Sequence, residues 1–499
     1  MPDPVTSPSV ASRAASVNEF IGRHRWTICG LVFAATTINY LDRNVLGLLK
    51  PVLSAKGVFG LDKADQELNY SHVVMCFQVA YAAGMLCAGK VIDKIGTKKG
   101  YAISLLGWSF AAIGHAFGHH TASFGFWRAA LGLTESGNFP AANKTIAEWF
   151  PKKERAFATG LYNSGANVGA IVAPITVPYI ADAWGWEWAF ILTGVIGLTW
   201  LAFWYALYGT PSAKLQSGKL SQAEYDFIHS DVDEQDAERA DVAKAKVSWF
   251  HLLEFRQTWS FFVGKFLTDP IWWFFMFWLP SFLNGENARK ATEFRAAFPI
   301  DPNTLKVQEF LAAHPGYTGS VYDLPGVHFP GVITWQLAVA VVYTISTFGS
   351  IFGGWLPKKF INGGMDPNKA RKLAMFIFAL FPLSVLFASR LGAINTWLAV
   401  LTIGVACAAH QAWSANIFTT VSDMFPKKAV ASVTGIGGMA GAVGGILIAW
   451  AAGLLLAHFQ TLGKIQVGYG ILFVFCGLAY IVAWLLMHLL VPKFKKIVL

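Results

Sequence analysis

Long apolar runs dominate this 499-residue chain and decide what it can fold into. We count twelve, each close to the roughly 20 residues that a helix needs to cross a bilayer. Because a lone strand leaves its backbone unpaired in lipid, each run is predicted to be a helix. Their approximate limits are 26–49, 71–92, 100–118, 123–148, 158–179, 187–209, 257–282, 332–356, 371–390, 395–421, 430–457 and 468–491. The sequence therefore predicts an all-α integral membrane protein embedded in the lipid bilayer.

Composition supports the same class and argues against others. The chain is 55% hydrophobic and 14% charged, whereas a soluble domain carries about 25% charged residues. A net charge of +10 would suggest nucleic acid in a soluble protein, but here we assign it to basic cytoplasmic loops and expect no nucleic-acid partner. No metal-ligand cluster, nucleophile–base set or nucleotide-binding motif occurs in a usable context. We expect neither a metal nor a cofactor, and no enzyme activity.

The loops alternate in charge along the chain. Lys and Arg gather in both tails and in the second, fourth, eighth and tenth loops, for example at Lys152 and Lys427, while the loops between them are sparse in basic residues. Cytoplasmic loops carry the excess of positive residues. We therefore expect a multi-pass protein of the cell (inner) membrane with both termini in the cytoplasm.

The two halves of the chain repeat. Phe150-Pro151-Lys152-Lys153 recurs 275 positions later as Phe425-Pro426-Lys427-Lys428, and the same offset aligns Gly169 with Gly444. Such a match after spans four and ten predicts two pseudo-symmetric six-helix bundles with a site between them. The predicted parts are an N-terminal tail 1–25, a bundle 26–209, a linker 210–256, a bundle 257–491 with an external insertion 283–330, and a tail 492–499.

Two spans hold charges where hydrocarbon should be. Span one contains Asp42 and Arg43, and span four contains Arg128 and Glu135. Each charge costs roughly 2.5–3.5 kcal/mol at a helix centre, so it must face a protein interior or a watery cavity. Opposite span directions place both sets at compatible depths, and we expect them to meet. Asp42 and Arg43 point about 100° apart around their helix, which predicts separate roles for them.

The chemistry of these side chains indicates what they do. An arginine fork matches a carboxylate, and an acid in a low-dielectric cavity can take up a proton near neutrality. Together they suggest that a carboxylated substrate moves with a proton. The alternative is a static ion-pair network that locks spans one and four together.

The loop after span two has a recognisable order of residues. It reads glycine, acid, base, glycine and base at Gly89, Asp93, Lys94, Gly96 and Lys98. An acid at a helix end can pair with basic groups across the bundle and so latch one conformation. This spacing resembles the signature loop of the major facilitator superfamily, which implies twelve helices in two bundles.

Further motifs narrow the resemblance. Asn39-Tyr40-Leu41-Asp42-Arg43, Glu135-Ser136-Gly137-Asn138-Phe139-Pro140 and Phe150 to Arg155 are similar to the anion:cation symporter family. Thr268 to Trp273 and Val421 to Lys428 resemble its hexuronate carriers. The resemblance implies that Asp42 and Glu135 carry protons and that Arg43 holds the substrate carboxylate. The insertion 283–330 departs from the family pattern, as a lid or as a plain folded loop.

Other polar or aromatic residues inside the spans are candidates for contacts with sugar hydroxyls or a sugar ring. Besides Arg43 and Arg128, the predicted substrate-binding residues are Asn39, Tyr40, Tyr81, Asn163, Trp272, Trp273, His410, Gln411 and Asn416. For any one of them, a polar contact that packs two helices together is an equal alternative. His410 stands out because the repeat offset aligns it with Glu135.

These features predict a proton-coupled symporter that imports a hexuronate such as galacturonate or glucuronate by alternating access. The partners are then a carboxylated sugar, protons and lipid, and we expect a monomer. One alternative is another organic anion: an aldonate, a dicarboxylate or a phosphate ester. Another is a membrane sensor that binds its ligand on a transporter fold without moving it.

Overall fold

The computed structural model describes residues 22–230, 249–297, 335–495 and 497. In this part of the chain every regular element is a helix. The first half contains α2 (His24–Ala55), α3 (Lys63–Ile95), α4 (Thr97–His115), α5 (Thr121–Glu135), α6 (Asn138–Trp149), α7 (Lys152–Trp184) and α8 (Trp186–Leu207). Short helices α9 (Pro211–Gln216), α10 (Gln222–Ile228) and α12 (Trp249–Leu252) belong to the linker.

The second half contains α13 (Arg256–Ala297), α15 (Trp335–Asn362), α16 (Pro367–Leu380), the 3₁₀ helix η2 (Phe381–Phe387), α17 (Ala388–Ile394), α18 (Thr396–Met424), α19 (Lys427–Thr461) and α20 (Ile465–Leu490). A helical segment thus occupies each of the twelve predicted spans, which confirms the all-α membrane class. Among the described residues, eight segments meet a length and hydropathy criterion for crossing a membrane. The segments that do not meet it include α2, α5–α6 and α13, whose charges are described below.

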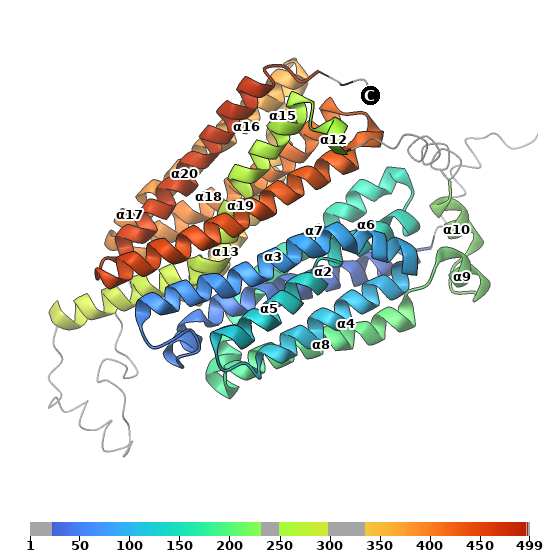
Figure 1. The fold of residues 1–499 in the computed structure, drawn as a ribbon. Coiled ribbons are helices and arrows are strands. Elements are labelled where there is room, and N and C mark those ends of the chain that lie inside the picture. The colour runs from blue at the N-terminus through green and yellow to red at the C-terminus, as the bar shows by residue number, and fades with distance from the viewer. Residues whose placement is uncertain (1–21, 231–248, 298–334, 496, 498–499) are drawn as a thin grey trace, which may run out of the picture.

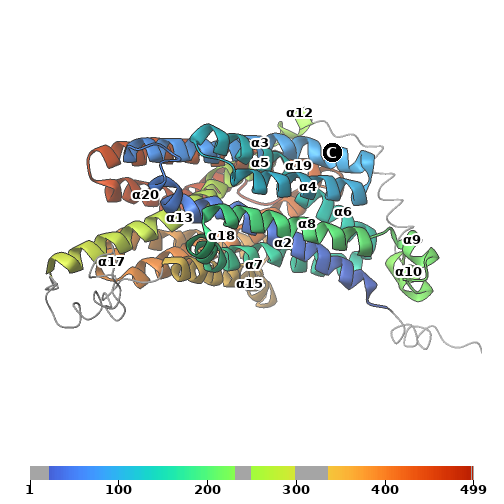
Figure 2. The ribbon, with the colours of Figure 1, turned by 90° about the horizontal axis from the view of Figure 1, so that it is seen from below.

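The helices form two bundles that lie side by side (Figure 1), and most run along a common axis (Figure 2). The linker helices α9 and α10 and the last turn of α20 lie at one end of the molecule, here called the linker end. The opposite end is called the far end. Large apolar side chains such as Phe110, Phe126 and Phe203 are exposed on the outside, as expected of surfaces that face lipid.

Equivalent glycines bring equivalent helices together in the two bundles. A Cβ atom on Gly169 of α7 would lie 2.4 Å from the carbonyl oxygen of Thr37 in α2. On Gly444 of α19 it would lie 2.5 Å from the carbonyl oxygen of Phe266 in α13. Small residues permit this close backbone approach in membrane bundles. The repeat in the sequence therefore corresponds to a repeat in packing, α2 against α7 and α13 against α19.

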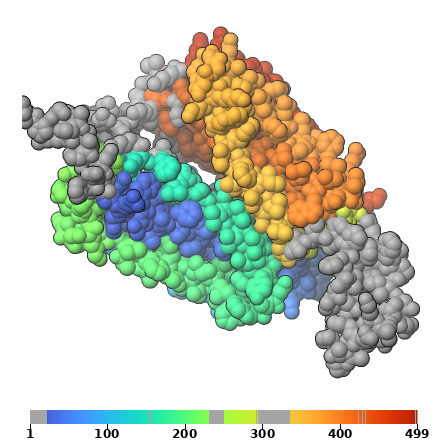
Figure 3. Space-filling model, turned by 180° about the vertical axis from the view of Figure 1, so that it is seen from behind, coloured from blue at the N-terminus to red at the C-terminus, as the bar shows by residue number. Residues whose placement is uncertain are grey.

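The bundles contact each other near the far end. Among the described residues, two hydrogen bonds join them: Tyr70 O–H donates to the Phe277 carbonyl at 2.7 Å, and Tyr343 O–H donates to Asn44 Oδ1 at 3.4 Å. Toward the linker end the bundles diverge, and the space-filling view shows an opening between them (Figure 3). The molecule is therefore closed at the far end and open at the linker end.

Two spans differ from their predicted form. Span four is interrupted between α5 and α6, at Ser136 and Gly137. The physical reason is Pro140, which has no N–H to offer the carbonyl of Ser136. The helix of span seven continues to Ala297, well beyond residue 283, where we had expected the external insertion to begin. The remainder of that insertion, 298–330, lies outside the described residues, as do tail residues 1–21 and linker residues 231–248.

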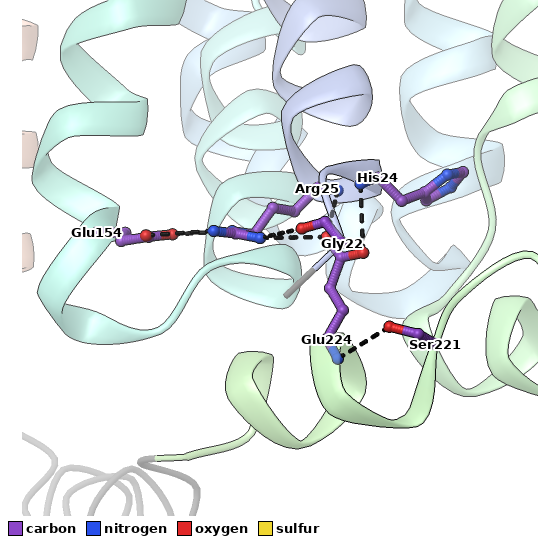
Figure 4. A network of polar contacts seen from close by, with 6 residues as sticks. All are labelled: Gly22, His24, Arg25, Glu154, Ser221 and Glu224. Carbon is purple, nitrogen blue, oxygen red and sulfur yellow. Dashed lines mark hydrogen bonds and ion pairs between the residues drawn. The ribbon is translucent and has the colours of Figure 1, made fainter. Parts of the chain in front are cut away.

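The linker is anchored to the first bundle through Glu224 of α10 (Figure 4). Its carboxylate, which is buried, accepts hydrogen bonds from the backbone N–H groups of His24 (3.3 Å) and Arg25 (3.1 Å) at the start of α2. These N–H groups have no partner within their own helix. Arg25 also donates to Glu154 at the start of α7, at 2.9 Å. One glutamate thus acts as a cap for α2 supplied by the linker.

Candidate functional site

A buried ion pair joins the two charged spans. Arg43 of α2 donates from Nε (3.0 Å) and Nη2 (2.8 Å) to the same oxygen, Oε2, of Glu135 in α5. Nη2 also lies 3.3 Å from Asn39 Oδ1, one turn earlier in α2. Both side chains of the pair are buried. The two sets of charges meet as the helix directions predicted.

Aromatic rings surround the guanidinium of Arg43. Its Cζ atom lies 4.9 Å from the ring centres of Tyr40 and Tyr81, 5.3 Å from Phe77 and 5.5 Å from Trp273. Trp273 comes from α13 of the other bundle, so Arg43 lies where the bundles meet. Cation–π contacts of this kind hold a desolvated guanidinium in place. We call Tyr40, Phe77, Tyr81 and Trp273 the aromatic box.

Several polar atoms around this pair lack partners. The hydrogen bonds of Arg43 to described residues come from Nε and Nη2 and not from Nη1. Glu135 Oε1 and Asn39 Nδ2 are buried without a hydrogen-bond partner among the described residues. Buried polar groups are nearly always hydrogen-bonded, so each exception needs an explanation. Here the unused donors and the unused acceptor belong to the Arg43–Glu135 pair and to Asn39 beside it, and they can serve as recognition groups for a polar ligand.

Arg128 lies behind the aromatic box. Its Nη2 reaches the backbone carbonyl of Arg43 at 3.4 Å, and its Cζ lies 4.7 Å from the ring centre of Phe77. Nε and Nη1 have no partner among the described residues. The side chain is fully buried. Arg128 therefore contacts the Arg43 backbone and forms no ion pair with a described residue.

Asp42 occupies a different position from its neighbour in sequence. It is 2% exposed, and neither carboxylate oxygen has a hydrogen-bond partner within 3.5 Å among the described residues, because the nearby Thr193 hydroxyl donates to the Phe190 carbonyl. It lies next to Thr193 of α8, inside the first bundle. Arg43, in contrast, turns toward Glu135 and the second bundle. The two side chains thus have different contacts, in keeping with their predicted separation around the helix, and their separate roles remain proposals.

The second bundle contributes an aromatic and histidine cluster. Trp272 of α13 stacks on His410 of α18, with ring centres 5.1 Å apart and planes 13° from parallel. His410 Nδ1 forms a 2.6 Å hydrogen bond with the hydroxyl of Tyr480. Trp272 also contacts the ring of Tyr343, whose hydroxyl bonds to Asn44 of the first bundle. His410 is thus fixed by two ring and hydroxyl contacts near the interface.

A second ion pair lies one turn before these tryptophans. Lys265 Nζ and Asp269 Oδ2, four residues apart on α13, are 2.6 Å from each other. Lys265 also lies 4.5 Å from the ring centre of Phe418. Asp269 packs against Gly441 of α19, where a Cβ atom would be 2.2 Å from Oδ2. This pair is complete within its own bundle.

The remaining predicted contacts have mixed outcomes. Asn416 donates to the Gly353 carbonyl at 2.8 Å and to the Ala412 carbonyl at 2.9 Å, so its amide joins α18 to α15. These are contacts of the helix-packing alternative, and binding of substrate by Asn416 stays a prediction. Asn163 is exposed and Gln411 is half-buried. Neither forms a hydrogen bond with another described residue.

The predicted latch residues Asp93 and Lys98 make their side-chain contacts within the first bundle. Asp93 forms a 2.7 Å ion pair with Lys144 of α6, and Lys98 donates to the Tyr208 carbonyl at 2.9 Å. Gly96 has φ +85°, a backbone conformation suited to glycine, at the α3–α4 turn. Lys94 is exposed and Gly89 is partly buried. A latch between the bundles is absent among described residues in this open-ended state.

Sequence reasoning missed a buried pair at the far end. Lys50 Nζ lies 2.7 Å and 2.6 Å from the two carboxylate oxygens of Glu67 in α3, and 4.5 Å from the ring centre of Tyr70. The two residues flank the α2–α3 loop, where charges look like ordinary loop residues. Their low exposure, 3% for Lys50, shows that the helices bury them together.

Two matched helical bundles with buried charges where they meet are the architecture of a membrane carrier. The sequence profile of the Major Facilitator Superfamily matches residues 32–300, more than half of the chain. The chain therefore belongs to the Major Facilitator Superfamily, whose members are transporters and not enzymes.

Individual relatives and a solved structure agree with this family. The chain is 28% identical over 468 residues to a hexuronate transporter of Escherichia coli K12, covering 92% of this chain and 93% of that protein. It is 33% identical over 259 residues to a galacturonate transporter of Dickeya chrysanthemi, covering 52% and 72%. The inward open xylose transporter XylE from E. coli shares the fold, with TM-score 0.65, 12% identity and coverage of 94% and 97%.

Proposed function

We propose that this protein imports a sugar acid together with at least one proton, and that the substrate is a hexuronate such as galacturonate or glucuronate. The observation that carries the proposal is the buried guanidinium of Arg43, held by Glu135 and the aromatic box with Nη1 free. A planar fork with a free N–H group suits a carboxylate. The named relatives, which carry hexuronate and galacturonate, support the same class of substrate.

The ring of the substrate would lie between the bundles. Tyr81 and Trp273 offer faces on which a sugar can stack, and Trp272 with His410 offers a second such surface. Arg43 binds the carboxylate in this arrangement, while Arg128 supports it from behind through the Arg43 backbone. Asn163 and Gln411 remain further candidates for hydroxyl contacts.

Proton coupling is assigned to Asp42 and Glu135. Burying a charge without a partner is costly, and both oxygens of Asp42 are buried without one. Glu135 is bound to Arg43, so a substrate carboxylate that takes Arg43 competes with Glu135. Release of Glu135 then favours its protonation. This competition links carboxylate binding to proton uptake and requires no additional residue.

The open linker end gives the state of the carrier. We place the termini and the linker in the cytoplasm of a cell whose inner membrane holds the protein as a monomer. The opening in Figure 3 is then the inward-open state, with the far end closed by the contacts of Tyr70 and Tyr343. Alternating access requires these contacts to break when the far end opens.

The test is uptake by purified protein in liposomes. Galacturonate or glucuronate should accumulate when the outside is more acidic, and a proton ionophore should abolish accumulation. A panel of aldonates, dicarboxylates and phosphate esters in competition identifies the preferred anion. Binding without flux would mark a sensor and would contradict transport. Uptake that is indifferent to the pH gradient would contradict proton coupling alone.

A further inference from the structure

Gln78 of α3 is a buried polar side chain that no role described above uses. It is 3% exposed, yet neither its amide nitrogen nor its amide oxygen has a hydrogen-bond partner among the described residues. Leaving a buried amide without a hydrogen bond destabilises the folded protein. An apolar residue would avoid that cost at a position that served only for packing. A ligand that binds and leaves would satisfy this amide.

The place of Gln78 defines that partner. Gln78 lies next to Phe77 and one turn from Tyr81, two members of the aromatic box. On the other side it faces Gly445 of α19, where a Cβ atom would lie 3.4 Å from Nε2. The same Cβ atom would lie 2.9 Å from Cδ1 of Trp273. The amide thus lies between the bundles, beside the indole that covers Arg43.

Neighbouring polar groups at this interface show that local partners are normally available. Ser71 Oγ donates to the Leu68 carbonyl at 2.7 Å, and Tyr70 O–H reaches Phe277. Asn44 donates to the Tyr40 carbonyl at 2.7 Å. These three residues complete their hydrogen bonds within the closed far end, whereas Gln78 does not. The difference marks Gln78 as a recognition group and not as interface packing.

We propose that the amide of Gln78 binds a hydroxyl group of the substrate while Arg43 binds its carboxylate. This inference rests on the proposed transport of a hydroxylated acid and assigns a specificity-determining residue for it. An amide offers both a donor and an acceptor, so it can pair with a sugar hydroxyl in either sense. Together the two residues select substrates in which a carboxylate and a hydroxyl are separated by the distance between the Arg43 and Gln78 binding groups.

The experiment compares the wild type with Gln78→Leu in liposomes, using the transported acid and its single deoxy analogues. In the wild type, one deoxy analogue should show a KM raised about 10- to 100-fold, because a site built to bond a hydroxyl rejects the analogue that lacks it. In Gln78→Leu that difference should shrink to less than about threefold. The KM for the full acid should rise while the maximal rate stays nearly constant.

Two further variants keep the outcome clear. Gln78→Met replaces the leucine variant if that protein does not fold, since methionine fills irregular space. Gln466→Leu in the first turn of α20 is the matched control, because its amide oxygen also lacks a partner, and it should leave the deoxy ratios unchanged. If Gln78→Leu retains every ratio of the wild type, the proposal is wrong. The deoxy analogues are derived from whichever acid the wild type transports. A finding that this acid is not a hexuronate would therefore contradict the proposed substrate without deciding the role of Gln78.

Discussion

In the N-terminal bundle, several hydrogen-bonding atoms of the buried charged residues lack partners among the described residues. In the C-terminal bundle, by contrast, the charged residues Lys265 and Asp269 form an ion pair with each other. The first arrangement leaves Arg43 Nη1 and Glu135 Oε1 available to a ligand. The second behaves as a neutral unit. The difference indicates that the first bundle binds the charged group of the ligand. The second bundle then contributes aromatic rings and neutral polar groups to the binding site.

The largest expected effect comes from replacing Arg43, the residue of the first bundle that is proposed to bind the substrate carboxylate. Arg43→Ala should lower uptake at low substrate concentration by about 100-fold or more, because loss of one partner of a buried, hydrogen-bonded charge pair costs about 2–5 kcal/mol of binding. Arg43→Lys should also weaken uptake, by about tenfold or more, because a point charge cannot replace the fork. Initial rates in liposomes measure both. Wild-type affinity in Arg43→Lys would remove Arg43 from the carboxylate site.

A second prediction separates binding from coupling. Glu135→Gln and Asp42→Asn should each reduce accumulation driven by a pH gradient by about tenfold or more, since the proton-carrying group of the site is gone. Exchange of labelled for unlabelled substrate needs no net proton movement and should persist. Counterflow and gradient-driven uptake on the same preparations measure the two. Full accumulation in both variants would contradict the coupling assignment.

The third prediction contrasts the two ion pairs directly. Lys265→Met and Asp269→Asn should each lower uptake, because each leaves a lone buried charge, and the double variant should recover most of the loss. Arg43→Met with Glu135→Gln should show no such recovery, because the substrate itself needs Arg43. Recovery in both double variants would mean that both pairs are structural. That outcome would favour the static network between α2 and α5.

A smaller effect is expected from packing beside the self-contained pair. Gly441→Ala would place a methyl group 2.2 Å from Asp269 Oδ2, and the adjustment should cost about 1–3 kcal/mol of stability. Gly438→Ala on the same helix has open space and serves as the control. Thermal melting of both purified variants measures the difference. Equal melting temperatures would contradict the tight contact between α19 and α13.

The smallest effect concerns His410. Tyr480→Phe removes the hydroxyl that bonds to His410 Nδ1, a loss of about 0.5–1.5 kcal/mol. The KM should change by no more than about tenfold, with proton coupling intact, because Trp272 still stacks on the imidazole. Uptake kinetics with and without a pH gradient measure this. Loss of coupling in Tyr480→Phe would bring His410 into the proton pathway and weaken the contrast between the bundles.

Much of this fold could be predicted because hydropathy acts locally. A run of apolar residues long enough to cross a bilayer has few alternatives to a helix, and the repeat at Phe150 and Phe425 gave the pairing of halves. The break at Ser136 was missed although Pro140 stands in the sequence. A proline in a membrane helix is compatible with either a kink or a continuous helix, and neighbouring helices decide between them.

The site was predictable in its charges and not in its neutral members. A charge inside an apolar span is so costly that it indicates a functional residue, and this cost identified Arg43 and Glu135 from the sequence. An amide such as Gln78 or Asn416 carries no such cost in sequence. Only the three-dimensional contacts separate Asn416, whose amide nitrogen donates to carbonyls of α15 and α18, from Gln78, whose amide forms no hydrogen bond with a described residue.

The closed far end has a thermal consequence. Each ion pair between described residues joins groups within one bundle or its attached linker, while aromatic residues and two hydrogen bonds join the bundles to each other. Separating aromatic surfaces and wetting them raises the heat capacity, and salt barely affects such contacts. A plot of the free-energy difference between the inward-open and outward-open forms against temperature should therefore be curved. The same free-energy difference should change little with ionic strength.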